Sequence, residues 1–201
     1  MKFQIATLVT AAVGLVSAYD DVQSKPFTLS LLSSDKSIDG STIGACHTGA
    51  GFESLCYGKG QGQTLYFNAS QYDEHKPNPN GHNIDGKLIF NLPIGNGAPV
   101  SSPMSFQYDY STNVVIPMFT ITDDVTYVSF NDKGYMVLHG YVDDTVTPPK
   151  AGKSHELPRW YACQTYYTAY TYHTLSWVMG NGKPENPSCV PVTVKRNFLK
   201  K

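Results

Sequence analysis

The sequence predicts an all-β protein, a single-domain antiparallel β-sandwich of the jelly-roll kind with about ten short strands. Three observations favour this class. Apolar and polar residues alternate with a period of two in several segments, which is typical of strands with one buried face. Pairs of turn-forming residues, such as Asp39-Gly40 and Asn96-Gly97, separate these segments at short intervals. No segment after residue 18 shows the longer period of an amphipathic helix.

The predicted strands fall into two groups along the chain. The regular strands have apolar residues at every second position and lie at residues 27–31, 88–92, 104–110 and 190–194. The less regular strands are apolar runs at residues 64–68, 114–120, 125–130 and 135–142. Pro117 lies inside one of these runs, and because proline donates no ladder hydrogen bond, it predicts an edge position or a bulge there.

Residues 1–18 have the pattern of a secretory signal peptide. Lys2 precedes an uncharged, mostly apolar run from Ile5 to Val16, and the small residue Ala18 ends the segment. The apolar run is too short to cross about 30 Å of hydrocarbon, and no later segment approaches a membrane span. We therefore expect cleavage after Ala18, no membrane partner, and residues 19–201 forming one secreted domain.

The composition excludes several classes of protein. The formal net charge is −1, from 15 Lys and Arg against 16 Asp and Glu, and 41% of the residues are hydrophobic, which is not the composition of a disordered chain. Basic residues are scattered and form no stripe that could neutralise phosphates, so we expect no nucleic-acid partner. Only 15% of the residues are charged, while 14 are Tyr. This balance indicates an extracellular surface of hydroxyl and aromatic groups, and we expect a monomer without a cofactor.

Four cysteines follow the signal peptide, and an even number in a secreted chain predicts disulfides with three possible connectivities. We favour Cys46 with Cys56 and Cys163 with Cys189, because each pair lies in its own turn-rich segment. A zinc site is the rival interpretation, but no CxxC or HxxxH spacing accompanies the cysteines. Asn68-Ala69-Ser70 is an N-glycosylation sequon. The alternative is that Asn68 is an ordinary residue at the end of a strand.

A tyrosine-rich segment offers a candidate ligand surface. Leu175, Trp177 and Met179 alternate with polar residues, so Trp177 is expected in the core. Tyr170 and Tyr172 then fall on the opposite face with Thr174. Exposed tyrosines on a strand can stack on sugar rings, although ordinary β-propensity produces the same row.

Motifs of well-known catalytic sites are missing: the sequence has no GxSxG, HExxH, P-loop or complete GxGxxG. Glu53 is still of interest, because it shares the turn-rich loop 46–56 with His47. A hydrolase using Glu53 with a His or Asp partner is therefore an alternative hypothesis, and a structural turn is the favoured one. His75 and His82 share a loop with three acidic residues (Asp73, Glu74, Asp85), but the loop lacks calcium-ligand spacing, and we expect no metal site.

The segments 43–56, 160–163 and 174–189, with their cysteines and flanking aromatic residues, resemble a family of small secreted fungal proteins of undefined function. The resemblance implies a single β-rich domain with a signal peptide and two disulfides, paired as favoured above. It supplies no catalytic residue. We therefore expect a secreted or cell-wall-associated binding or host-interaction protein rather than an enzyme, with a cell-wall glycan or a host surface component as its partner. The candidate ligand surface is made of Tyr170, Tyr172, His47 and Glu53.

Overall fold

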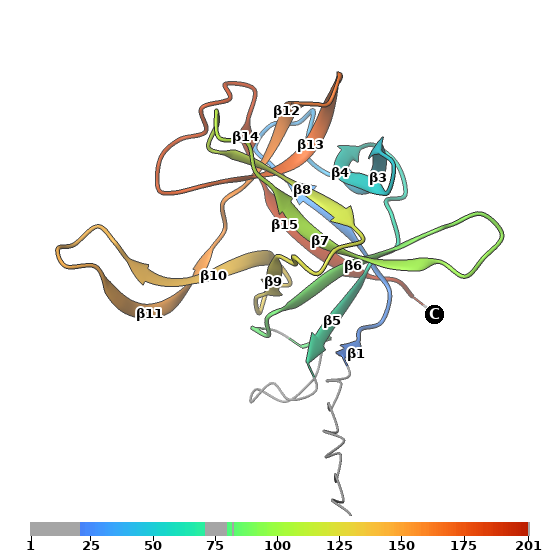
Figure 1. Ribbon diagram of the computed structural model, residues 1–201, viewed down its shortest axis with the longest axis horizontal. Helices are drawn as coiled ribbons and strands as arrows, with labels where there is room; N and C mark the ends of the chain where they lie inside the picture. The colour runs from blue at the N-terminus through green and yellow to red at the C-terminus, as the bar shows by residue number, and fades with distance from the viewer. Residues whose placement is uncertain (1–20, 71–79, 82, 201) are drawn as a thin grey trace, which may run out of the picture.

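The computed structural model describes residues 21–70, 80–81 and 83–200, so the predicted signal peptide and the two histidines His75 and His82 lie outside the described residues. In the described ranges the chain contains no helix and fifteen strands, all paired antiparallel (Figure 1). The strands are β1 (Asp21–Gln23), β2 (Phe27–Leu32), β3 (Thr42–Gly49), β4 (Phe52–Gly58), β5 (Tyr66–Ser70), β6 (Gly86–Leu92), β7 (Val100–Gln107), β8 (Val114–Thr120), β9 (Tyr127–Phe130), β10 (Met136–Asp143), β11 (Lys150–Leu157), β12 (Trp160–Tyr167), β13 (Tyr170–Val178), β14 (Val190–Pro191) and β15 (Thr193–Phe198).

The all-β class is confirmed, whereas the jelly-roll sandwich is not. The strands join in one sheet along the path β11-β10-β9-β6-β7-β8-β13-β4-β3-β2-β15, with β1, β5, β12 and β14 attached beside it. The described strands outnumber the predicted ten because segments that were not predicted as strands, such as those of β3, β4 and β11, are strands as well. Some short strands also share one long neighbour. One edge of β6, for example, pairs first with β9 and then with β7.

The sheet curls around one core as a half-barrel, and a few backbone contacts join the start of β10 to β15. Tyr135, just before β10, forms an isolated bridge with Lys195 of β15. Next to that bridge, the backbone N–H of Arg196 donates to the backbone carbonyl of Gly134 at 2.9 Å. A second bridge joins Phe27 to Leu65 and so ties β2 to the start of β5. These contacts close the inner face of the sheet over the apolar side chains.

The core contains the residues that the alternation predicted to be buried. Phe27, Leu29 and Leu31 of β2 are fully buried. Trp177 is 4% exposed, as expected, and its ring lies 4.9 Å from that of Trp160 in an edge-to-face contact. The buried indole N–H of Trp160 has a hydrogen-bond partner, because it donates to the Met136 carbonyl at 2.8 Å.

Pro117 lies in an interior strand rather than at an edge. β8 has β7 on one side, where Phe106 pairs with Pro117. On its other side the partner changes along the strand, from β13 at Val114 and Val115 to β4 at residues 118–120. Residues 116 and 117 are the gap between those two partners, and a missing N–H is tolerated there without an edge or a bulge.

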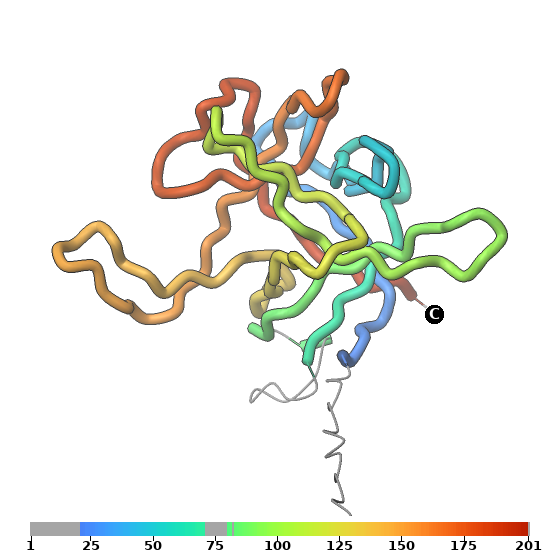
Figure 2. Tube along the Cα trace, in the orientation of Figure 1, coloured from blue at the N-terminus to red at the C-terminus, as the bar shows by residue number. Residues whose placement is uncertain are grey.

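A long two-stranded arm, formed by β10 and β11, projects from the body (Figures 1 and 2). Its pairing runs from Leu138–Leu157 to Asp143–Lys150 and includes a register shift after Gly140. Residues 150–156 are exposed on both faces of the strand. The sequence prediction therefore missed β11, since a strand without a buried face shows no alternation.

The face of the sheet opposite to the core is partly covered by a second, smaller cluster. Val114, Cys163 and Val178 are its buried members. In this region we call that face the outer face. It carries the side chains Phe52, Ser105, Gln107, Ile116, Thr120, Thr165 and Tyr172, as the strand registers require.

Both disulfides join neighbouring strands or their ends. Cys46 of β3 is bonded to Cys56 of β4, and Cys163 of β12 is bonded to Cys189, just before β14. These are the two pairs that the sequence favoured. The segment 46–56, however, is a β-hairpin with its turn at Ala50 and Gly51 rather than an irregular loop.

Candidate functional site

The outer face carries a groove that runs across the ends of β7 and β8. The groove consists of two adjoining cavities, of about 630 Å³ and about 330 Å³, which both have Gln107 and Tyr108 in their walls. We call it the tyrosine groove. Because β7 ends at Gln107, the Tyr108 side chain is freed from the sheet, and it lies between the two cavities with 53% of its surface exposed.

The larger cavity is built by three segments that are distant in sequence. The turn between β3 and β4 contributes Gly51, and the start of β4 contributes Phe52. The left-handed φ of +77° at Gly51 is a conformation that favours glycine. The chain after β8 contributes Ile121 and Asp124. The floor between them is polar, since the hydroxyls of Ser105 and Thr120 lie 3.2 Å apart. The cavity therefore combines exposed aromatic and aliphatic groups with hydroxyls.

The smaller cavity has an apolar floor and polar walls. Val114 and Ile116 of β8 form the floor, and Thr165 and Tyr167 of β12 stand on one side. Asn186 closes the end, where its Nδ2 donates to the Gln164 carbonyl at 2.8 Å and ties the loop before Cys189 to β12. The arrangement can take an elongated ligand with one apolar side and several polar groups.

The charge of the groove is entirely acidic. Asp124 in the larger cavity and Asp109 in the smaller one are the charged residues in the described walls, and no Lys, Arg or His lines either cavity. The hydroxyl and N–H of Ser111 donate to the Asp109 carboxylate and lower its pKa. Burial raises the pKa of Tyr108, and the negative charge of Asp124 raises it further. At neutral pH the groove therefore has a neutral Tyr108 flanked by two carboxylates.

The two predicted surface tyrosines, Tyr170 and Tyr172, line neither cavity, but they lie beside residues that do. In the hairpin of β12 and β13, Tyr170 pairs with Tyr167 and Tyr172 pairs with Thr165, and paired residues share a face. The rings of Tyr170 and Tyr172 lie 6.4 Å apart in an edge-to-face arrangement. The two predicted tyrosines therefore lie on the same face as Thr165 and Tyr167, next to the end of the groove that these two residues line.

The predicted exposure of Thr174 is wrong. Thr174 does share a face with Tyr172, but its side chain is fully buried. Its hydroxyl lies 2.9 Å from that of Thr165 and 3.1 Å from that of Ser176. The second half of β13 is covered on both faces, so the exposed row ends at Tyr172.

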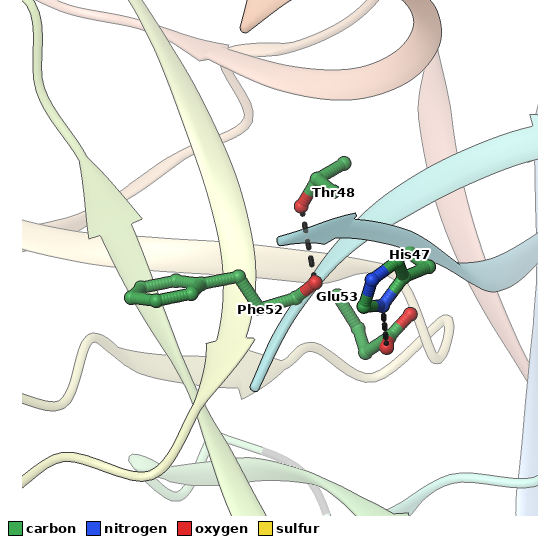
Figure 3. Close-up of polar contacts among 4 residues, drawn as sticks. All are labelled: His47, Thr48, Phe52 and Glu53. Carbon is green, nitrogen blue, oxygen red and sulfur yellow. Dashed lines mark hydrogen bonds and ion pairs between the residues drawn. The ribbon is translucent and has the colours of Figure 1, made fainter. Parts of the chain in front are cut away.

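The hypothesis of a partner for Glu53 finds one in His47. The two residues pair across β3 and β4, and the Nδ1 atom of His47 lies 3.0 Å from Oε1 of Glu53 (Figure 3). The Glu53 side chain is 13% exposed and that of His47 is 72% exposed. Figure 3 shows the ring of Phe52 pointing away from this pair, and the Thr48 hydroxyl donating to the Phe52 carbonyl at 3.2 Å.

The His47–Glu53 pair and the groove occupy opposite faces of the sheet. Glu53 pairs with Phe119, a core residue, whereas Phe52 faces the groove. Neither His47 nor Glu53 lines either cavity of the groove. The four residues predicted as one ligand surface thus form two separate patches.

Asn68, the residue of the glycosylation sequon, lies in β5 between β1 and β6. Its Oδ1 atom is buried and has no hydrogen-bond partner in the described part of the chain. The side chain lines a third cavity of about 220 Å³, beside the ion pair in which Lys87 Nζ lies 2.8 Å from Asp21 Oδ2. Glycosylation of Asn68 remains a prediction.

Sequence reasoning missed the importance of Tyr108. It continued the strand pattern from Met104 to Tyr110, but β7 ends at Gln107 and the chain turns at Asp109. Asp109 accepts hydrogen bonds from both the N–H and the hydroxyl of Ser111, two residues later. The Asp-x-Ser spacing is itself a turn signal, and it could have ended the predicted strand at this point.

Over residues 21–70, 80–81 and 83–200, no group of three or more His, Cys, Asp or Glu is placed to hold a metal ion. Within the same ranges, no helix has the length and apolar character needed to cross a membrane.

Comparison with known proteins identifies a family but no activity. A family model for a domain of unknown function, DUF7907, matches residues 24–198, which include every strand from β2 to β15. No curated protein and no solved structure matches the chain significantly. The matched segment contains both disulfides and the whole tyrosine groove. The chain therefore belongs to the DUF7907 family of domains of unknown function.

Proposed function

We propose that the protein is an extracellular carbohydrate-binding protein that takes a glycan in the tyrosine groove. The observation that carries the proposal is the position of Tyr108, which lies in the wall of both cavities with hydroxyl and amide side chains around it. A tyrosine offers a flat apolar ring for the face of a sugar and a polar group for its edge. Each cavity is within the usual size range of ligand sites, about 300 to 1,000 Å³.

Secretion is part of the proposal. Residues 1–18 have the pattern of a signal peptide, and the two disulfides are typical of proteins made in an oxidising compartment. The resemblance to small secreted fungal proteins supports a fungal source and a place at the cell wall or a host surface. The glycans to test first are therefore those of cell walls, chitin and β-glucan.

A glycan array probed with the purified protein tests the proposal. We expect binding to wall-type oligosaccharides, a strong loss with Tyr108→Ala, and a smaller loss with the double variant Tyr170→Ala/Tyr172→Ala, because these two residues lie beside one end of the groove. Tyr141→Ala is the matched control, since this exposed tyrosine lies on the arm. Absence of binding to every glycan, or equal losses with the control, would refute the proposal.

A hydrolase using Glu53 and His47 is the second candidate, and one observation favours it. The carboxylate and imidazole are within hydrogen-bond reach, as a catalytic pair requires. Against it, the pair stands outside the groove, and His47 is widely exposed. If purified protein hydrolyses wall oligosaccharides and Glu53→Gln abolishes this activity, the hydrolase is correct. If the protein has no such activity, this candidate is wrong.

A further inference from the structure

We propose that the tyrosine groove selects amine-bearing glycans, such as β-linked glucosamine chains, over neutral glycans of the same length. This inference rests on the proposed function, because it assigns a ligand class to the same groove. Its basis is the charge of the groove together with the position of that charge relative to the aromatic rings.

The charge complementarity comes from two carboxylates and the absence of any cation. Asp124 lies in the larger cavity and Asp109 in the smaller one, so each compartment offers one negative group. No basic side chain from the described residues lines either cavity, so neither carboxylate is neutralised by a cation of the cavity walls. A ligand with a repeated positive charge therefore finds a carboxylate in both compartments, whereas an anionic glycan is repelled.

The aromatic side chains lie where they can add to this attraction. Tyr108 stands between the two compartments, and Asp124 is near enough for its charge to raise the pKa of the Tyr108 phenol. Tyr110 is fully exposed beside the larger cavity. An ammonium group next to a carboxylate and above an aromatic ring gains from both, which is the arrangement found in many ammonium-binding sites.

Asp109 keeps its charge to a lower pH than an ordinary aspartate does. The Ser111 hydroxyl and N–H donate to this carboxylate at 2.6 and 2.8 Å and lower its pKa. The same conditions protonate a sugar amine, so protein and ligand carry opposite charges over a shared acidic range.

A sugar fits the walls better than a basic peptide does. Six hydroxyl side chains line the two cavities: Ser105, Ser111, Thr112, Thr120, Thr122 and Thr165. Gln107 and Asn186 add two amides. These side chains both donate and accept hydrogen bonds, as the ring hydroxyls of a sugar do. An extended peptide would leave many of these side chains without a hydrogen-bond partner.

The experiment compares three hexamers by calorimetry at low salt: glucosamine, N-acetylglucosamine and glucose, each β-1,4-linked. We expect the glucosamine hexamer to bind about tenfold more tightly than the other two, as about two partly screened charge contacts would give. Because exposed charges are screened, this preference should shrink when salt is raised to about 0.5 M.

Two substitutions remove the charges with little change of shape. Asp109→Asn keeps an oxygen to accept the Ser111 hydrogen bonds, and Asp124→Asn changes a side chain on an exposed loop. The double variant should bind all three hexamers equally. Asp123→Asn is the matched control, because it removes the same charge from the neighbouring residue, whose side chain lines the third cavity. This variant should keep the preference.

Each outcome separates the two proposals. Equal binding of all three hexamers, or a preference lost equally in the Asp123→Asn control, overturns the amine selectivity and leaves the carbohydrate groove in place. Failure of every hexamer to bind contradicts both proposals. Binding of a Lys-bearing, proline-rich peptide without any sugar does the same and identifies a peptide groove instead.

Discussion

The guanidinium carbon of Arg196 lies 4.1 Å from the centre of the Phe130 ring. Two further rings complete a cage around this cation, Phe198 at 4.6 Å and Phe27 at 5.7 Å. Arg196 is 6% exposed and donates to the Gly81 carbonyl at 3.1 Å. Burial lowers its pKa to about 10, so the side chain remains a cation at neutral pH. A buried cation that faces three rings locks β15 against β2 and β9.

Replacing Arg196 should test how much this cage stabilises the fold. Arg196→Ala leaves a cavity among three rings and removes the donor from the Gly81 carbonyl, so we expect a loss of about 3 kcal/mol in the free energy of unfolding. Arg196→Met fills most of the volume without burying a charge and should lose less. Urea denaturation measures both. Equal midpoints for the alanine variant and the wild type would show that the cage contributes nothing.

The two disulfides should differ in their contribution to stability. Cys163 and Cys189 are 26 residues apart, and Cys46 and Cys56 are 10 apart, so the first bridge restricts the unfolded chain more. In the chain-entropy account the difference is about 0.8 kcal/mol. Cys163 is also fully buried, and its loss disturbs the second cluster. Calorimetry of the two double-alanine variants should show the lower Tm for Cys163→Ala/Cys189→Ala, and the reverse order would contradict this account.

The arm of β10 and β11 should open without unfolding the body. Its outer residues bury little apolar surface, and a two-stranded ribbon alone is marginally stable. We expect amide hydrogens at residues 141–154 to exchange at least about a hundredfold faster than those of β13. Limited trypsin digestion should cut first at Lys150 or Lys153, and mass spectrometry identifies the site. A first cut at Lys87, in the sheet, would contradict the expectation.

Occupancy of Asn68 can be measured directly. If the sequon is used, endoglycosidase treatment lowers the mass of the secreted protein by one N-glycan, and Asn68→Gln lacks that mass from the start. We expect one glycan, whose first sugar meets the cavity beside Lys87 and Asp21. An unchanged mass after treatment would instead identify Asn68 as a residue of β5 without a modification.

Two exposed aspartates should make the stability of the fold depend on pH in the acidic range. The hydroxyl and N–H of Ser37 lower the pKa of Asp35, and those of Ser111 lower the pKa of Asp109, both from the ordinary value of 3.8. A lowered pKa in the folded state means that this stabilisation is present above pH 3.8 and is lost as the pH falls through the folded value.

Asparagine at both positions keeps the turn hydrogen bonds and removes the titration. The double variant Asp35→Asn/Asp109→Asn should therefore lose less Tm than the wild type between about pH 5 and about pH 2.5. Thermal melts across this range measure the effect, with Asp144→Asn on the arm as control. Parallel pH profiles for the double variant and the wild type would rule out this linkage.

The sequence predicted those strands of the fold in which one face is buried and the other is exposed to solvent. Phe27, Leu29 and Leu31 show this, and the predicted strand 27–31 nearly coincides with β2. The pattern failed in two opposite situations. All seven residues of β8 are buried, so the pattern could not show where this strand ends or which face meets the core. Residues 150–156 of β11 are exposed, so they show no alternation at all.

The candidate site was predicted only in part, because alternation says which face a residue occupies but not which faces come together. Tyr170 and Tyr172 were predicted to lie on a ligand surface; they share a face with Thr165 and Tyr167 but line neither cavity, so their binding role stays a prediction. His47 and Glu53 were grouped with them, although the register between Cys56 and Thr174 puts the two pairs on opposite faces and on opposite sides of that contact. The groove itself joins the turn after Ala50, the end of β7 and the loop after β8, which no local pattern links.

The pairing of β2 with β15 also orders events during synthesis. Phe27 pairs with Phe198, so β2, which meets β3 early, gains its second sheet neighbour only after almost the whole domain has been made. Until then, Leu29 and Leu31 have an open edge beside them, and a chain in that state is exposed to wrong pairing. Because β15 is made after every other described strand, a chaperone that covers the open edge of β2 would protect the nascent chain from wrong pairing.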